Sequence, residues 1–227
     1  MKYLLKITLL VLFINVLPGA FTQAQSKRML NTTLQAELLQ MQEIDQIAAY
    51  KNYIAPRKEK MTTQQRETYK DSVFKAHHKR LGVIFDQYGF PGYDLVGKSG
   101  SKAFWLMTQH FDEYVDFQQK ILKAMKREVK RGNANGKNYA YLTDRVLVNT
   151  GKKQKYGTQV LYDNSVGKPY PKPLQNPKKV DKYRRAVGME PLHKYLNSMA
   201  ELHFQMNKQF FKSKGITKPF QYKSTDK

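Results

Sequence analysis

Residues 114–132 read YVDFQQKILKAMKREVKRG, and this stretch decides the fold class. Its apolar side chains recur every three or four positions, the spacing of one face of an α-helix: Tyr114, Phe117, Ile121, Leu122, Met125 and Val129. Lysines and arginines occupy the opposite face, and Gly132 stops the pattern. Gln118 falls within the apolar stripe, so the pattern predicts a buried amide at this position. We interpret the basic face as solvated, with binding to an anionic membrane surface as the alternative.

The same periodicity covers most of the chain on both sides of this stretch. Helices are expected over residues 31–53, 64–87, 101–110, 112–131, 139–148, 180–187 and 191–211. A loop through Gly97 and Gly100 is expected before the third of these helices. Thr62 or Thr63 is expected to cap the second helix, and Asp112 the fourth. Residues 146–148, Val-Leu-Val, leave a strand open as an alternative.

The helices expected over residues 31–53 and 191–211 each have a defined apolar face. The first should bury Leu34, Leu38, Met41, Ile44, Ile47 and Ala48. The last should bury Leu192, Leu196, Met199, Leu202, Met206 and Phe210. Phe204 lies off the stripe of the last helix, whereas His203 lies within it and is expected to be a hydrogen-bonded core histidine.

The period changes to two after residue 155. Residues 156–162 alternate as a β-strand does, residues 163–167 predict a turn, and residues 168–174 a returning strand. Prolines at 169, 171 and 173 confine that return strand to an edge. The chain is therefore predicted to be mainly α (α+β), a single helical domain with one small antiparallel β-hairpin.

The first residues resemble a secretory signal peptide. Lys2 and Lys6 precede an apolar run that Pro18 and Gly19 end, and small residues follow up to Ala24. Cleavage near Ala24 would release a periplasmic or secreted protein. The run is shorter than the ~20 residues that span a bilayer, although a permanent membrane anchor is the alternative. The expected organisation is a signal peptide (1–24), a single mostly helical domain (25–212) and a polar basic tail (213–227).

Composition restricts the chemistry and the partners. The chain has no cysteine, which excludes disulfides and thiolate chemistry. Its formal net charge is +22, so anionic surroundings should attract it. Export and the absence of a recognisable binding motif argue against nucleic acid as the partner. A small polar or anionic envelope ligand, or an anionic membrane surface, fits better. Oligomeric state cannot be deduced from the sequence.

Three short polar clusters lie where periodicity would place a core: residues 109–112, 143–145 and 154–159. Because buried polar groups need partners, these clusters predict a site. The candidate ligand-binding residues are Gln109, Arg145, Gln154, Tyr156, Thr158 and Gln159. The catalytic candidates are His110, because imidazole exchanges protons near neutral pH, and Asp144 as its partner. Gly157 within a strand suggests close approach of a backbone or of a ligand.

Each of these residues also has a purely structural interpretation. His110 can close a helix, Asp112 can cap one, and Asp144 can pair with Arg145 as an internal ion pair. The glutamines can form a network that only specifies the core. His77 and His78 are adjacent and point about 100° apart on a helix, so they predict surface residues rather than a metal site. No cofactor is expected, since the chain has neither a phosphate-binding glycine loop nor a Gly-x-Ser-x-Gly turn.

The order and spacing of several motifs resemble a bacterial family known as domain of unknown function 6624. The resemblance covers about residues 44–195. Its motifs are Ile44-Asp45-Gln46, Gly89-Phe90-Pro91, Val96-Gly97-Lys98, Gln109-His110-x-Asp112, Phe117-Gln118, Ala140 to Arg145, Gly151 with Gln154-x-Tyr156-Gly157-Thr158-Gln159, and Arg185 with Gly188. The family pattern has Trp where this chain has Phe90. The resemblance implies a single, mostly helical domain and assigns no activity.

Two functions follow as expectations. The first is an exported domain that binds a small polar or anionic ligand through a His, Gln, Asp, Arg and Tyr cluster. The second is a hydrolase or transferase with His110 as general base, Asp144 as its partner, and Arg145 with Gln159 holding the substrate. Both require Gln109, His110, Asp144, Arg145, Tyr156 and Gln159 to lie in one spatial cluster.

Overall fold

The structure is a computed structural model that describes residues 29–49 and 61–223. The expected signal peptide lies outside the described residues. The elements are α1 (Thr32–Ala49), α2 (Thr63–Tyr88), α3 (Tyr93–Thr108), α4 (Val115–Lys130), α5 (Gly136–Asn149), β1 (Val160–Asp163), β2 (Lys168–Pro171), the 3-10 turn η1 (Pro177–Lys179), α6 (Val180–Ala186), α7 (Leu192–Met206) and α8 (Lys208–Ser213). The prediction of a mainly helical fold with one antiparallel hairpin is confirmed.

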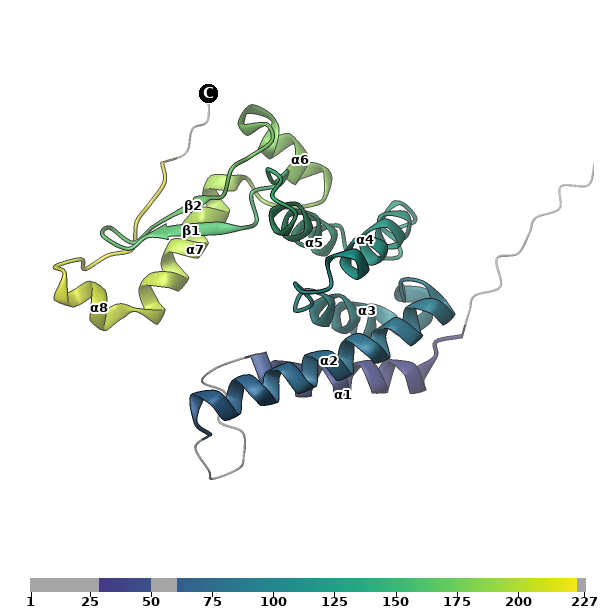
Figure 1. Ribbon diagram of the computed structural model, residues 1–227. Helices are drawn as coiled ribbons and strands as arrows, with labels where there is room; N and C mark the ends of the chain where they lie inside the picture. The colour runs from purple at the N-terminus through teal and green to yellow at the C-terminus, as the bar shows by residue number, and fades with distance from the viewer. Residues whose placement is uncertain (1–28, 50–60, 224–227) are drawn as a thin grey trace, which may run out of the picture.

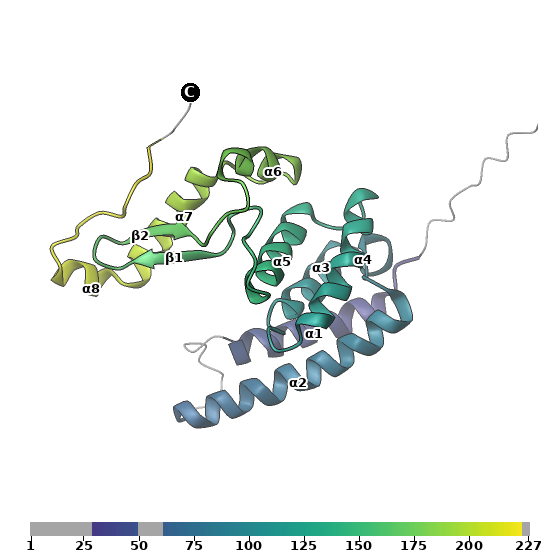
Figure 2. The same cartoon turned by 45° about the horizontal axis from the view of Figure 1, so that its top comes forward.

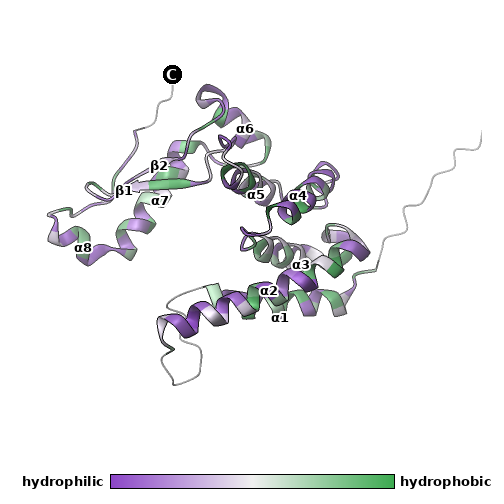
Figure 3. Ribbon diagram, in the orientation of Figure 1, coloured by the Kyte–Doolittle hydropathy of each residue, from purple (hydrophilic) through white to green (hydrophobic). Residues whose placement is uncertain are grey.

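Helices α1 to α5 form the larger part of the molecule (Figures 1 and 2). Helix α1 lies along α3 and α2, and α4 packs against α5. Their facing sides form one hydrophobic core that includes Leu38, Phe104 and Ile121, all fully buried. Gln118 is also fully buried, which confirms the predicted buried amide in α4. The N-terminal part of α2, which begins at Thr63, consists mainly of hydrophilic residues (Figure 3).

The hairpin, α6, α7 and α8 form the second part, with α7 packed against β2. The two strands pair antiparallel, with Leu161 opposite Tyr170 and Tyr162 opposite Pro169. The strands are shorter than expected, because residues 154–159 are drawn into contacts with α5 instead of extending the ladder. Gln154 still forms an isolated parallel bridge with Leu174.

Two helix starts show the chemistry that fixes them. Thr62 caps α2: its side chain accepts from Gln65 N at 3.2 Å, and the Gln65 side chain accepts from Thr62 N at 2.8 Å. The expected cap of α4 by Asp112 is wrong. Tyr114 occupies the N-cap position without a side-chain bond, and the Asp112 carboxylate turns towards α5.

The predicted loop before the third helix is instead a kinked beginning of α3. Gly97 adopts φ +66°, a conformation that L side chains rarely take, and a Cβ there would lie 2.7 Å from Gln35 Nε2. Gln35 of α1 donates to Val96 O at 2.9 Å, next to the kink. Gly97 therefore lets α1 approach α3 closely.

The buried face expected for the last helix is confirmed at Leu196 but is wrong in the C-terminal half of the helix. The helical path breaks at Asn207 between α7 and α8, and Leu202, Met206 and Phe210 are exposed. Phe204 is buried instead and stacks on Phe211 at 5.7 Å. His203 is partly buried and hydrogen-bonded to Asn164 at 3.0 Å, so it lies beside the core rather than within it.

The expected polar tail begins at residue 213, and its described residues reach 223. Near that end the tail contacts α7 and β2. Tyr222 N donates to Asn197 Oδ1 at 2.7 Å, and the Tyr222 hydroxyl donates to Pro169 O. Lys168 of β2 lies over the rings of Phe220 and Tyr222. None of the helices in the described ranges is long and apolar enough to cross a membrane.

Candidate functional site

A buried carboxylate on α1 holds His110. Asp45 has 0% exposure, and His110 Nδ1 lies 2.8 Å from its Oδ2 and 3.0 Å from its Oδ1. An ionised carboxylate can only accept, so this geometry places a proton on Nδ1 and leaves Nε2 as the acceptor of a neutral ring. Nε2 makes no hydrogen bond to any described residue, and 21% of the side chain is exposed. The arrangement is that of a general base with an orienting carboxylate.

Two residues of α2 complete the surroundings of this pair. The Phe74 ring stacks on His110, with centroids 5.0 Å apart. His77 Nδ1 lies 3.9 Å from Asp45 Oδ1, too far for a hydrogen bond but close enough for electrostatic attraction when protonated. Burial favours the neutral form of Asp45, but His110 and His77 outweigh burial and hold the pKa of Asp45 below its usual value.

Asp112 engages Arg145 of α5. Arg145 Nε and Nη2 donate to the two carboxylate oxygens at 2.7 Å and 2.6 Å, and Asn149 Nδ2 adds a third bond at 2.7 Å. Burial raises the pKa of Asp112, but its hydrogen bonds and the positive charge of Arg145 lower the pKa by more. The pKa of Asp112 therefore lies below its usual value. The predicted pairing of Arg145 with Asp144 is therefore wrong, and Nε and Nη2 are already engaged within the chain.

Asp144 organises the loop that follows α5. Its fully buried carboxylate accepts from the backbone N–H groups of Lys155 at 2.8 Å, Tyr156 at 3.0 Å and Thr158 at 2.9 Å. The Thr158 hydroxyl donates to it as well, at 3.1 Å. Burial raises the pKa of Asp144, and these hydrogen bonds offset part of the rise. Asp144 is thus bonded to the backbone, and the predicted His110–Asp144 partnership is corrected to His110–Asp45.

Gln154 closes the same loop from inside. Its amide donates to Gln159 O at 2.9 Å and to Lys172 O at 2.7 Å, and accepts from Gln159 N at 2.9 Å. Gln159 Nε2 donates to Thr158 Oγ1 at 3.2 Å. A Cβ at Gly157 would lie 2.9 Å from the side chain of Leu192 and 3.4 Å from that of Leu174, so side chains rather than another backbone approach it closely. Its φ of +73° adds a second reason for glycine. The loop is a sealed network of internal bonds.

The sequence profile of a family of unknown function (DUF6624) matches residues 32–206. The chain belongs to this family. The match covers the residues of the helical core, the His110 pair and the Asp144 loop. No curated protein and no solved structure matches the chain.

In the DUF6624 chain, the predicted cluster divides into three groups with different partners. His110 joins Asp45, Arg145 joins Asp112, and Asp144 joins the loop that contains Gln154, Tyr156, Thr158 and Gln159. Asp45 was missed as a site residue because Ile44 was assigned to the buried face. Spacing alone would have found it: Leu34, Leu38, Met41 and Asp45 are separated by four, three and four residues, and Ile44 is exposed.

Several buried polar atoms of α2, α4 and the end of α3 have no hydrogen-bond partner among the described residues. Gln109 Nε2, Gln118 Oε1 and His77 Nδ1 are buried without a hydrogen-bond partner, as is Trp105 Nε1 one turn before Gln109. Gln118 Nε2 bonds Thr108 O at 3.0 Å and approaches Asp112 Oδ1 at 3.3 Å, so it ties α4 to the segment that carries His110. Buried polar groups without partners cost about 1–3 kcal/mol each, which makes this segment of the DUF6624 fold the best candidate for ligand contact.

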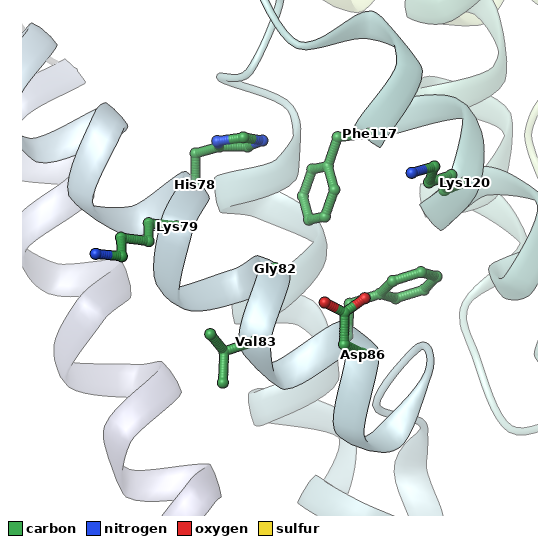
Figure 4. A pocket seen from close by; sticks show the side chains of 8 residues that line it. His78, Lys79, Gly82, Val83, Asp86, Phe117 and Lys120 are labelled. Carbon is green, nitrogen blue, oxygen red and sulfur yellow. The ribbon is translucent and has the colours of Figure 1, made fainter.

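A surface hollow lies between α2 and α4 (Figure 4). It has a volume of about 300 Å³ and joins a second of about 500 Å³ with which it shares His78, Phe117 and Lys120. Lys79 and Lys120 stand on opposite sides of it. His78 stacks on Tyr114 with centroids 3.7 Å apart, and burial lowers the pKa of His78. His78 follows Phe74 by one helical turn, so the hollow adjoins the His110 surroundings.

The prediction that His77 and His78 are both surface residues is wrong for His77, because the packing of α2 against α1 buries it. His77 is buried beside Asp45, whereas His78 is partly exposed at the hollow. Within residues 29–49 and 61–223, no group of three or more metal-ligating side chains is placed to hold an ion. The direct 2.8 Å contact of His110 with Asp45 leaves no space for an ion between them.

We expect Asp45→Asn to remove a pH-dependent part of the stability. The folded-state pKa of Asp45 lies below the unfolded value, about 3.9, so its contribution is present above that pH and is lost as pH falls through the folded pKa. Urea denaturation should show the variant weaker than the parent by roughly 1–3 kcal/mol at neutral pH, with the gap closing in acid. Asp86→Asn, at an exposed position of α2, is the control. A gap that is constant with pH would contradict the prediction.

Proposed function

We propose that this protein is an exported envelope protein that binds a small polar or anionic ligand and acts on it as a hydrolase or transferase. His110 is the general base, and Asp45 is the residue that positions it. The observation that carries the proposal is the bond from His110 Nδ1 to a carboxylate with 0% exposure, while Nε2 stays free of protein partners. The proposal of export rests on the basic and apolar start of the chain.

A contribution to the stability of the fold does not by itself explain why a charged residue occupies position 45. Replacing a buried ionic group and its partners by apolar residues of similar volume is often neutral or stabilising. A buried carboxylate at the end of the apolar face of α1, with a lowered pKa and two histidines beside it, is the kind of arrangement found at functional sites.

The chemistry needs a proton acceptor and a stabilised cation. His110 Nε2 takes a proton from a water molecule or a substrate hydroxyl, whose oxygen then attacks an electrophilic carbonyl or phosphoryl centre. The protonated ring next gives that proton to the leaving group, and Asp45 stabilises the imidazolium in between. Gln109 Nε2, a buried donor without a partner one residue away in the chain, is available to bind a polar group of the ligand.

The first of the two predicted functions is a binding domain that uses Gln109, Arg145, Gln154, Tyr156, Thr158 and Gln159, four of which lie in the loop of residues 154–159. The sealed bonding of that loop gives it little support, because Gln154, Asp144 and the loop backbone already satisfy one another. The hollow at His78 adjoins the His110 surroundings and supports a ligand near His110 instead.

A substrate screen with matched variants tests the proposal. The full chain is assayed against chromogenic carboxylic esters and phosphate esters, with His193→Asn as the control histidine. Turnover by the parent should fall by at least about tenfold in His110→Asn and Asp45→Asn, and the Asp45 variant should also shift the pH profile of kcat. Asp45→Glu should restore part of the activity. Turnover that survives in His110→Asn would refute His110 as the base.

A further inference from the structure

Arg184 of α6 is a fully buried cation outside the His110 site. Its exposure is 0%, and it is the largest of the fully buried side chains described. Nε donates to Glu190 O at 2.6 Å and Nη1 donates to Tyr156 O at 2.7 Å. The guanidinium also lies over the Tyr195 ring, 4.9 Å from its centroid. Both hydrogen bonds go to neutral carbonyl groups.

The third nitrogen of the guanidinium has no partner. Nη2 is buried, and no described residue accepts a hydrogen bond from it. Arg184 forms no salt bridge with any described carboxylate. Asp181 and Glu190 attract its charge only from a longer distance. The Asp181 carboxylate accepts a hydrogen bond from Leu192 N at 2.7 Å. Burial lowers the pKa of Arg184, as expected for a cation without a contact counter-ion.

A buried charge without a paired counter-charge is costly, far more so than a buried neutral polar group. A water molecule at Nη2 would satisfy the donor but would bring no charge. An anion would do both, and one oxygen is sufficient because Nε and Nη1 are already engaged.

We infer that Arg184 Nη2 is the anchor of an internal anion site that takes a single carboxylate or phosphate oxygen. Tyr141 lies at the more accessible side of the group: it is only partly buried, and its ring packs on Tyr195 at 6.3 Å. The anion would enter past Tyr141. Because Arg184 also holds Tyr156 O, occupation of the site would stabilise the loop that Asp144 holds from its other side. The site is independent of the function proposed for His110.

The adjacent arginine supplies a matched control. Arg185 has the same charge and lies next on α6, but its side chain is exposed. Thermal midpoints of the full chain are measured against sodium phosphate and sodium acetate, with a bulky sulfonate buffer keeping ionic strength constant and chloride as a third series. Four proteins are compared: the parent, Arg184→Met, Arg184→Lys and Arg185→Met.

The parent and Arg185→Met should show a saturable rise in thermal midpoint with phosphate or acetate, roughly 5–10 °C at a hundredfold excess over Kd. Both Arg184 variants should lose this saturable rise; the phosphate and acetate series show which oxyanion binds better. Absence of a saturable rise in the parent would mean that water satisfies Nη2, and would overturn the inference. The same rise in Arg184→Met and Arg185→Met would overturn it as well.

A measurement on the parent keeps the inference testable if the Arg184 variants do not fold. Hydrogen exchange with and without phosphate should show slower exchange in the segments that the guanidinium touches, residues 156–158 and 184–190. Protection confined to other segments would overturn the assignment to Arg184.

Discussion

Asp144→Asn is expected to lower the free energy of unfolding by about 2–5 kcal/mol, one of the two largest effects in this protein. The substitution replaces one carboxylate oxygen by an NH₂ group, which cannot accept a hydrogen bond. Loss of Oδ1 leaves Lys155 N facing a donor, and loss of Oδ2 leaves Thr158 N facing one, whereas Tyr156 N contacts both oxygens and keeps one acceptor. The bonds that remain are weaker as well, because they no longer go to a charged group. Each buried donor left without a partner costs about 1–3 kcal/mol.

Urea denaturation followed by circular dichroism measures this loss. Asp86→Asn makes the same chemical change at an exposed position of α2 and should alter stability by less than about 0.5 kcal/mol. Equal losses in the two variants would show that the Asp144 bonds contribute little to stability.

Gln154→Met is expected to have the second largest effect, a loss of about 2–4 kcal/mol. Methionine fills a similar volume but leaves Gln159 N, Gln159 O and Lys172 O without the amide that pairs them. The expected loss is smaller than the full cost of leaving three buried groups without hydrogen-bond partners. These backbone groups are only partly buried, so water can bond to some of them.

The loss should be local as well as global. Hydrogen exchange should become faster over residues 154–175 in Gln154→Met, while the α1–α3 core keeps its protection. Gln119→Met, on the exposed face of α4, is the matched control. Unchanged exchange at residues 154–175 would contradict the role given to Gln154.

Periodicity predicted most of the helices because burial on one face of a helix leaves a regular trace in the sequence. Gln118 is the clearest case: its place in the stripe of α4 was enough to predict a buried amide. The same method failed in α7, where the buried side chains include Leu196, Ala200 and Phe204 rather than Leu202 and Met206. It failed at α8 because a stripe extrapolated through Asn207 assumes one straight helix. The break at Asn207 rotates the following face, which leaves Phe210 exposed and Phe211 buried.

The candidate site was predictable only in part: the sequence identified His110 but neither its partner Asp45 nor the other pairings. The sequence indicates that His110, Asp144 and Arg145 are polar groups within apolar patterns, yet it cannot show which charge meets which. Asp144 bonds the backbone of residues 155–158, and backbone N–H groups have no signature in the sequence. Asp45 lies 65 positions from His110, so only the packing of α1 against α3 brings them together.

The hairpin bears on how the protein behaves when it is concentrated. Its two strands form a sheet of only two members, and Leu161, Val166 and Tyr170 expose apolar surface on it. Such a sheet invites other chains to add strands along its free edges. In β2, however, Pro169 and Pro171 have no N–H group to offer. Lys172 N donates to Gln159 O, so the even-numbered positions face β1 and the two prolines face the free edge. An incoming strand would find no donor at either position of β2 on that edge, so this edge resists growth into fibrillar aggregates.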